Sequence, residues 1–257
     1  MHVLQPDSGL GLFQSLIHGI GSRFPQMAWR CGIKKGKEVQ KMKRGVLAMV
    51  AIALGVLLAS SLHGNRAAAG TPVIVAFGDS LTAGFGLPQD EAFPAQLEKA
   101  LKARGQEVKV VNAGVSGDTA SAGLARLDWA LPEDASGVII ELGANDALQG
   151  LDPTATKATL EKMIVGIKAR GLPILLAGME APRNLGKDYV EQFRALYADL
   201  AARYDLILYP FFLDGVALDD KYLMGDGLHP NAEGVARIVE GILPKVEELL
   251  AKAKPQP

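Results

Sequence analysis

Short runs of apolar residues recur along the chain from about residue 72 onward. Each run is rich in Val, Ile and Leu and is bounded by glycine or polar residues, which is the pattern of strands buried on both faces of a parallel sheet. The expected strands are Val73 to Phe77, Val108 to Val111, Val138 to Leu142, Ile174 to Ala177 and Leu206 to Phe211.

Between these runs lie amphipathic stretches with helical spacing. The expected helices are Ala92 to Arg104, Thr119 to Trp129, Thr154 to Arg170, Tyr189 to Tyr204 and Ala232 to Lys252. Parallel strands need helical crossovers, so the alternation predicts one three-layer α/β domain with a five-stranded, mostly parallel sheet. We expect Trp129 and the Phe211-Phe212 pair to serve packing and not substrate contact.

The first 69 residues do not follow this alternation. They carry nine Lys and Arg against two acids, whereas residues 70–257 carry 18 against 26. A basic group at Lys41, Lys43 and Arg44 precedes an apolar run from Val46 to Leu58, and small residues end the segment at Ala69. This order is typical of a secretory signal peptide. We therefore expect residues 1–69 to be a leader and residues 70–257 to be the mature domain.

The leader leaves two alternatives open. Cleavage near Ala69 predicts a periplasmic or secreted protein, whereas an apolar stretch counted from Gly45 to Leu62 allows a retained inner-membrane anchor that faces the periplasm. No cysteine follows the apolar run, which argues against a lipid anchor. Signal sequences begin close to their start codon, so translation is expected to start at Met42.

Composition limits the partners and cofactors of the domain. The acidic balance of residues 70–257 argues against a nucleic-acid partner. Cys31 is the one cysteine of the sequence, so the mature domain has no disulfide and no thiol nucleophile, and His229 is its one histidine. A metal site with several histidines is excluded, and we expect no cofactor and no metal. The sequence also lacks G-x-S-x-G, G-x-x-x-x-G-K-[ST] and H-E-x-x-H. These absences argue against an ordinary α/β-hydrolase, a P-loop nucleoside triphosphatase and a zinc protease.

Polar and small residues gather where the expected strands end. Gly78-Asp79-Ser80 follows the first strand, Asn112 to Thr119 the second and Gly143 to Asp146 the third, while Asp226 to Pro230 precedes the last helix. Gly78-Asp79-Ser80 reads as a tight loop. Ligand sites of open α/β sheets lie outside the carboxyl ends of the strands, so all four segments are expected to meet at one crevice.

The sequence around these segments resembles the SGNH hydrolases of the GDSL family, and within it the bacterial thioesterase I, lysophospholipase L1 and arylesterase group. The resemblance runs from about residue 72 to about residue 250 and is carried by GDSLTAG, VVNAGVSGDTASAGLARL, ELGANDAL and DGLHPN. It implies a flavodoxin-like three-layer fold and a serine nucleophile at Ser80, with His229 as base and Asp226 as the residue that orients it. It also implies an oxyanion hole made of Ser80, Gly117 and Asn145.

The chemistry of the residues agrees with these roles. A serine hydroxyl needs a base within hydrogen-bond reach, and His229 is the one imidazole of the domain. Asp226 lies three residues earlier and can fix the tautomer of that ring. Gly117 allows a backbone N–H to approach a substrate oxygen, and Asn145 offers a side-chain donor. We expect Asp79 and Asp146 to hold turns, and Asn231 to cap the last helix.

The sequence constrains the substrate less than the reaction. The family implies hydrolysis of carboxylic esters or thioesters, including aryl esters and lysophospholipids, through an acyl-enzyme. Ala147, Leu148, Met179 and Pro182 are the expected substrate-binding residues, and the apolar loops favour an apolar acyl chain. A carbohydrate acetyl esterase and a non-catalytic flavodoxin-like binding domain remain as alternatives. We expect a monomer with no obligate protein partner, which touches a membrane only through an uncleaved signal segment.

Overall fold

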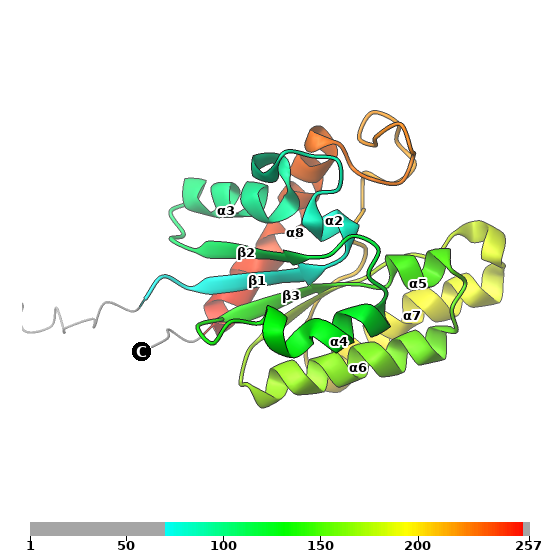
Figure 1. The fold of residues 1–257 in the computed structure, drawn as a ribbon, viewed down its shortest axis with the longest axis horizontal. Helices are drawn as coiled ribbons and strands as arrows, with labels where there is room; N and C mark the ends of the chain where they lie inside the picture. Colours follow the sequence, from blue (N-terminus) through cyan, green and yellow to red (C-terminus); the bar gives the residue numbers. More distant parts are fainter. Residues whose placement is uncertain (1–69, 254–257) are drawn as a thin grey trace, which may run out of the picture. The chain divides into compact units, whose positions relative to one another are not determined.

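The computed structural model describes residues 70–253, so the expected leader lies outside the described residues. These residues fold around one five-stranded sheet (Figure 1). Its strands are β1 (Val73–Gly78), β2 (Lys109–Gly114), β3 (Gly137–Glu141), β4 (Ile174–Ala177) and β5 (Ile207–Tyr209). They follow the order β2-β1-β3-β4-β5, and every neighbouring pair is parallel. The expected α/β fold is confirmed, with a sheet that is wholly parallel.

Helices cover both faces of the sheet, as Figure 1 shows. On one face α3 (Phe93–Ala103) packs against α8 (Ala232–Lys252). On the other face α6 (Pro153–Ala169) packs between α4 (Ala120–Ala130) and α7 (Lys187–Tyr204). No helix within residues 70–253 combines the length and the hydropathy that crossing a bilayer requires.

Strand β1 lies inside the sheet, between β2 and β3. All six of its residues are buried, which explains the unbroken apolar run that predicts it. Fully burying a side chain such as Ile74 or Phe77 contributes about 1.5–3 kcal/mol. The strand pairs with β2 and β3 so that Gly78 lies level with Gly114 and Glu141. Three strand ends therefore meet at the same edge of the sheet.

Four short elements and the ends of four of the five strands differ from the sequence prediction. The one-turn helices α2 (Ser80–Ala83) and α5 (Ala144–Leu148) and the 3₁₀ turns η1 (Gln89–Glu91) and η2 (Arg183–Leu185) replace expected loops. Strand β2 continues to Gly114, so residues 112–114 belong to the strand and not to the loop after it. Gly114 cannot carry a side chain, because a Cβ atom there would lie 2.3 Å from the backbone nitrogen of Ala83.

Trp129 does not pack in the interior. Its side chain is 74% exposed on α4, so the packing role expected for it is wrong, whereas Phe212 is fully buried as expected. The buried residues of α4 include Gly123 and Leu127, and a position two residues after Leu127 points about 200° away from it around the helix.

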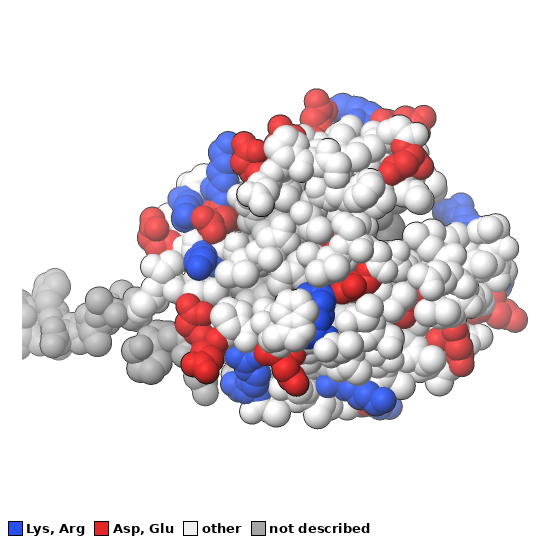
Figure 2. Space-filling model, viewed as in Figure 1, with Lys and Arg blue, Asp and Glu red and all other residues white. Residues whose placement is uncertain are grey.

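The charged side chains in Figure 2 are scattered, with acids beside Lys and Arg, and form no continuous basic patch on the visible face of the described residues.

Candidate active site

Ser80 lies at the point where strand β1 turns into a helix. Strand β1 ends at Gly78, and Ser80 is the first residue of α2. The Asp79 side chain caps this helix, since its Oδ1 accepts the backbone N–H of Leu81 at 3.0 Å. Asp79 therefore holds the turn, as the sequence predicts. The turn presents Ser80 at the carboxyl edge of the sheet, with its side chain partly exposed.

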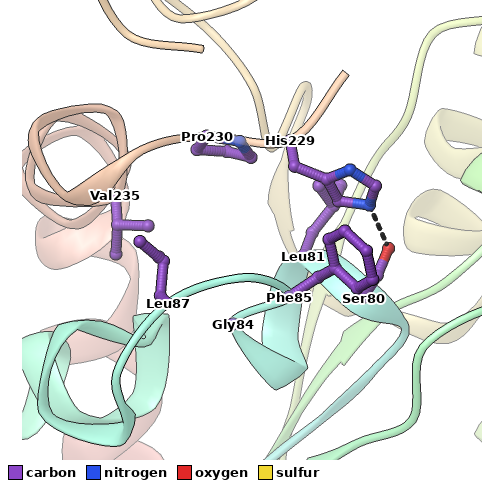
Figure 3. Close-up of a pocket in the computed structure, with 8 residues that line it drawn as sticks. All are labelled: Ser80, Leu81, Gly84, Phe85, Leu87, His229, Pro230 and Val235. Carbon is purple, nitrogen blue, oxygen red and sulfur yellow. Dashed lines mark hydrogen bonds between the residues drawn. The ribbon is translucent and has the colours of Figure 1, made fainter. Parts of the chain in front are cut away.

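A chain of two hydrogen bonds joins Ser80 to the loop before α8. The Oγ atom of Ser80 lies 3.0 Å from Nε2 of His229, as Figure 3 shows. Nδ1 of the same ring lies 2.6 Å from Oδ2 of Asp226. The ring of Phe85 packs on the imidazole, with 4.4 Å between the ring centroids. The structure thus brings together the three residues that the sequence proposes as nucleophile, base and orienting acid.

The loop itself keeps Asp226 ionised. The Oδ1 atom of Asp226 accepts the backbone N–H groups of Leu228 and His229, at 2.9 and 3.0 Å. These bonds and the bond to the imidazole favour the charged form, so they hold the pKa of Asp226 well below its usual range. The ionised carboxylate of Asp226 accepts a hydrogen bond from the N–H at Nδ1. Nε2 is then left as the acceptor that faces the hydroxyl of Ser80.

The backbone N–H groups of Ser80 and Gly117, which the sequence proposes as oxyanion donors, are both unpaired, since within the described residues they donate to no protein acceptor. Gly117 has φ +88°, a left-handed conformation that favours glycine, and nothing lies within 4 Å of the position of a Cβ atom. The backbone conformation, and not crowding by protein atoms, therefore accounts for the glycine.

The amide of Asn145 is held in place by two acceptors. Its Nδ2 donates to Oδ2 of Asp79 at 3.2 Å and to the carbonyl oxygen of Asp118 at 3.0 Å. Asn145 lies in the first turn of α5, directly after β3. Asp146 next to it accepts the N–H of Ala120 at 2.8 Å, which agrees with the structural role expected from the sequence.

A pair of buried carboxyl groups lies behind this turn. Asp79 and Glu141 are both fully buried, and Oε2 of Glu141 accepts the hydroxyl of Thr82 at 2.7 Å and the N–H of Asp79 at 3.3 Å. The other oxygen of Glu141 has no protein partner among the described residues. Burial raises the pKa of Asp79 to about 6, and burial beside Asp79 raises the pKa of Glu141 well above its usual range. Burial therefore disfavours the state in which both groups of the pair are ionised.

A shallow pocket lies on the imidazole side of Ser80. Figure 3 shows its lining, in which apolar side chains accompany Ser80 and His229. Those apolar residues are Leu81, Phe85, Leu87, Pro230 and Val235.

The four expected substrate-binding residues do not line this pocket. Ala147 and Met179 are buried, at 1% and 2% exposure, while Pro182 is partly exposed. Leu148 is 52% exposed at the end of α5, close in sequence to Asn145. Of the four, Leu148 offers the largest apolar surface to a substrate.

The sequence reasoning missed two buried charged residues at this edge. Glu141 ends an apolar strand, and an acid at the end of such a run is itself a signal of a polar site. Arg126 lies one position before Leu127 on the buried side of α4, where a charge is rare unless it is paired. Within residues 70–253 no group of three or more His, Cys, Asp or Glu side chains is arranged to hold a metal ion.

Comparisons with known proteins all point to one family of esterases and lipases. The model of the GDSL-like lipase/acylhydrolase family matches residues 76–237. Esterase TesA of Pseudomonas aeruginosa is 39% identical over 203 residues, which cover 79% of this chain and all of TesA. An arylesterase of Vibrio mimicus is 40% identical over 168 residues, which cover 65% of this chain and 84% of the relative.

Solved structures agree with these sequence matches. A crystal structure of TesA has a TM-score of 0.66 and 38% identity, and the match covers 69% of this chain and 99% of that one. A crystal structure of AlinE4, an SGNH-hydrolase family esterase, has a TM-score of 0.59 and 43% identity, with 70% and 97% coverage. The SGNH-hydrolase fold predicted from the sequence is thus confirmed. The chain belongs to the GDSL-like lipase and acylhydrolase family.

Proposed function

We propose that the protein is a serine esterase that hydrolyses carboxylic esters or thioesters through an acyl-enzyme on Ser80. The observation that carries this proposal is the hydrogen-bonded chain from Asp226 through His229 to the Ser80 hydroxyl, with distances of 2.6 and 3.0 Å. These are the distances at which a base can take a proton from a nucleophile in the ground state. Membership of the family supports the same reaction.

The first half of the reaction forms the acyl-enzyme. Oγ of Ser80 attacks the carbonyl carbon of the substrate while Nε2 of His229 takes the hydroxyl proton. Asp226 stabilises the resulting imidazolium through Nδ1. When the tetrahedral intermediate collapses, His229 gives its proton to the departing alcohol or thiol. The bond from the carbonyl carbon to that group breaks, and the acyl group stays on Ser80.

The second half returns the enzyme to its starting state. A water molecule loses a proton to Nε2 of His229 and attacks the acyl carbon. Collapse of the second intermediate breaks the bond to Ser80 and returns the proton to its oxygen. The product is a carboxylic acid. Both halves of the reaction use the same base and the same oxyanion donors.

The negative charge of each intermediate falls on the former carbonyl oxygen. We propose that the backbone N–H groups of Ser80 and Gly117 donate to it, because neither has an acceptor within the described residues. Asn145 would join them by exchanging its longer bond, the 3.2 Å contact with Asp79, for the substrate oxygen. One such donor contributes about 3–4 kcal/mol in the transition state.

The apolar surface near Ser80 favours an apolar substrate. Phe85 and Leu148 expose 49% and 52% of their surfaces, and the pocket beside His229 is lined by aliphatic and aromatic side chains. Ala147, Met179 and Pro182 would support this surface from behind and contribute less to binding. An apolar acyl chain or an aryl group is therefore the proposed guest, and a lysophospholipid or an aryl ester is the proposed substrate class.

The destination of the protein follows from the sequence of its leader. We propose that residues 1–69 direct export, that cleavage occurs near Ala69, and that residues 70–257 act in the periplasm or outside the cell. An uncleaved anchor in the inner membrane is the rival proposal, and N-terminal sequencing of the exported product separates the two. We propose that the domain acts as a monomer without an obligate protein partner.

The direct test is the variant Ser80→Ala. It deletes one oxygen from a partly exposed side chain, so the fold should be kept and turnover of p-nitrophenyl hexanoate should be lost. Circular dichroism and thermal unfolding would check the fold. A variant that hydrolyses the ester at the rate of the wild type would remove Ser80 as nucleophile, and with it the proposed mechanism.

A further inference from the structure

Arg126 is a buried cation that the reaction described above does not use. It lies on α4 and is 7% exposed, with its guanidinium carbon 4.2 Å from the centroid of the Phe77 ring. Three of its nitrogens donate hydrogen bonds. Nε donates to the Asp118 carboxylate, Nη1 to the carbonyl oxygen of Ala113 at 2.9 Å, and Nη2 to that of Gly78 at 2.9 Å.

The acceptors of these bonds belong to the segments that carry the proposed oxyanion donors. Gly78 ends β1 two residues before Ser80. Asp118 directly follows Gly117, and its own carbonyl oxygen accepts the Asn145 amide at 3.0 Å. Ser80 is therefore two residues from an acceptor of the guanidinium, and Gly117 is one residue from another. Asn145 is linked by one hydrogen bond to Asp118, whose carboxylate also accepts from the guanidinium.

The shape of the side chain fits this arrangement. A guanidinium is a rigid planar fork whose N–H groups point in fixed directions, so it sets the relative positions of the three acceptors together. A lysine would supply the same charge on a flexible stem and cannot reproduce the fork. Burying an ion pair such as Arg126–Asp118 gives little net stability compared with apolar packing, so stability alone is a weak reason for an arginine at this place.

We propose that Arg126 is a positioning residue that fixes the oxyanion hole by tying the ends of β1 and β2 to the loop at Gly117. This inference rests on the proposed function, because it concerns the donors of that same site. Arg126 itself does not touch the substrate. Its loss would let Gly117 and Asn145 drift from the positions at which they meet the developing charge, which weakens binding of the transition state more than binding of the substrate.

The test compares Arg126→Lys with the matched control Arg170→Lys. Arg170 also donates from two nitrogens to backbone carbonyl oxygens, those of Leu131 and Pro132 at 3.0 and 2.8 Å, but it lies at the end of α6. With p-nitrophenyl hexanoate we expect Arg126→Lys to lower kcat about tenfold or more and to leave KM within about twofold. Arg170→Lys should leave both constants within about twofold of the wild type.

A second readout separates positioning from loss of folded protein. Titration of active sites with a fluorophosphonate to completion counts the folded enzyme, and kcat is expressed per titrated site. Free guanidinium ion, at concentrations that do not unfold the protein, should restore part of kcat to Arg126→Ala and none to Ser80→Ala. A folded Arg126→Lys with kcat near that of the wild type, or a loss that vanishes per titrated site, would overturn the proposal.

Asp118→Asn keeps the test decisive if the arginine variants do not fold. It leaves an amide oxygen to accept from Nε of Arg126 but removes the charge of the pair. We expect a loss confined to kcat and smaller than that of Arg126→Lys, and an unchanged kcat would contradict the inference. Failure of the proposed function is distinct from all of these results, because it requires Ser80→Ala to keep its activity.

Discussion

Nδ1 of His229 lies 2.6 Å from a carboxylate oxygen of Asp226, a residue three positions earlier in the same loop. The same carboxylate also accepts the backbone N–H of His229 at 3.0 Å. The proposed base and its orienting acid are therefore built into one short turn. Ser80 reaches them from the end of β1, 149 positions away along the chain.

Replacing Asp226 with asparagine should lower kcat strongly and leave the fold intact. The variant lets an amide N–H face Nδ1, which favours the wrong tautomer of His229, so we expect a loss of about 10²- to 10⁴-fold. The control is Asp219→Asn, because Asp219 also accepts a local backbone N–H, that of Lys221 at 3.0 Å. Equal kcat in Asp226→Asn and the wild type would show that this carboxylate does not orient the base.

Replacing Asn145 with alanine should remove one proposed oxyanion donor. We expect kcat for a p-nitrophenyl ester to fall by about 10²- to 10³-fold with little change in KM, because the bond forms in the transition state. Gln149→Ala changes an exposed amide at the end of the same helix and serves as control. A rise in KM at constant kcat would instead assign Asn145 to ground-state binding.

The buried carboxyl pair should make stability fall as pH rises. The folded state raises the pKa of Asp79 to about 6, whereas the unfolded chain releases this proton near pH 4. The contribution of Asp79 is therefore favourable at low pH and is lost as pH rises from about 4 through about 6. Glu141 extends this loss to higher pH, since its own pKa is also raised.

The variant Glu141→Gln tests this assignment. Its amide oxygen keeps an acceptor for Thr82 and the Asp79 N–H, but the second ionisable group is gone. Urea unfolding at about pH 5 and about pH 8 should show a smaller loss of unfolding free energy in the variant than in the wild type. Glu240→Gln, which changes an exposed acid, should follow the wild type. Identical pH dependence in all three proteins would mean that Glu141 holds no proton in the folded state.

The length of the acyl chain should control the rate. Each CH₂ that becomes buried contributes about 0.8 kcal/mol, nearly fourfold in apparent affinity. We expect kcat/KM for p-nitrophenyl esters to rise from acetate to at least hexanoate and then to level or fall. Much of the gain should appear in KM if the chain is bound equally in the ground and transition states. A maximum at acetate with loss by butyrate would favour the carbohydrate acetyl esterase.

The main elements of the fold follow from hydrophobic periodicity, because strands buried on both faces and helices buried on one face leave different patterns. The one-turn helices α2 and α5 leave no such pattern, since four or five residues are too few to show a period. Trp129 shows a related limit. A single apolar residue does not reveal which side of a helix is buried, and its position relative to Leu127 places it in solvent.

The reacting residues can be proposed from the sequence because they sit in short segments at strand ends. The buried residues that hold these segments in place cannot be proposed from the sequence. Glu141 and Arg126 act through contacts with residues 59 and 48 positions away, Thr82 and Gly78, and no local pattern encodes such pairs. The apolar wall beside His229 likewise depends on how Phe85 packs against the imidazole in three dimensions. These features require the structure.

Covalent labelling tests the central claim most directly. The oxygen of an activated serine displaces fluoride from a fluorophosphonate and forms a stable bond to its phosphorus. Digestion and mass spectrometry of labelled residues 70–257 therefore identify the nucleophile. The domain contains four serines, at positions 80, 116, 121 and 136. The account predicts one label, on Ser80, with loss of esterase activity in proportion to labelling. A label on Ser116, Ser121 or Ser136, or full activity after complete labelling of Ser80, would contradict it.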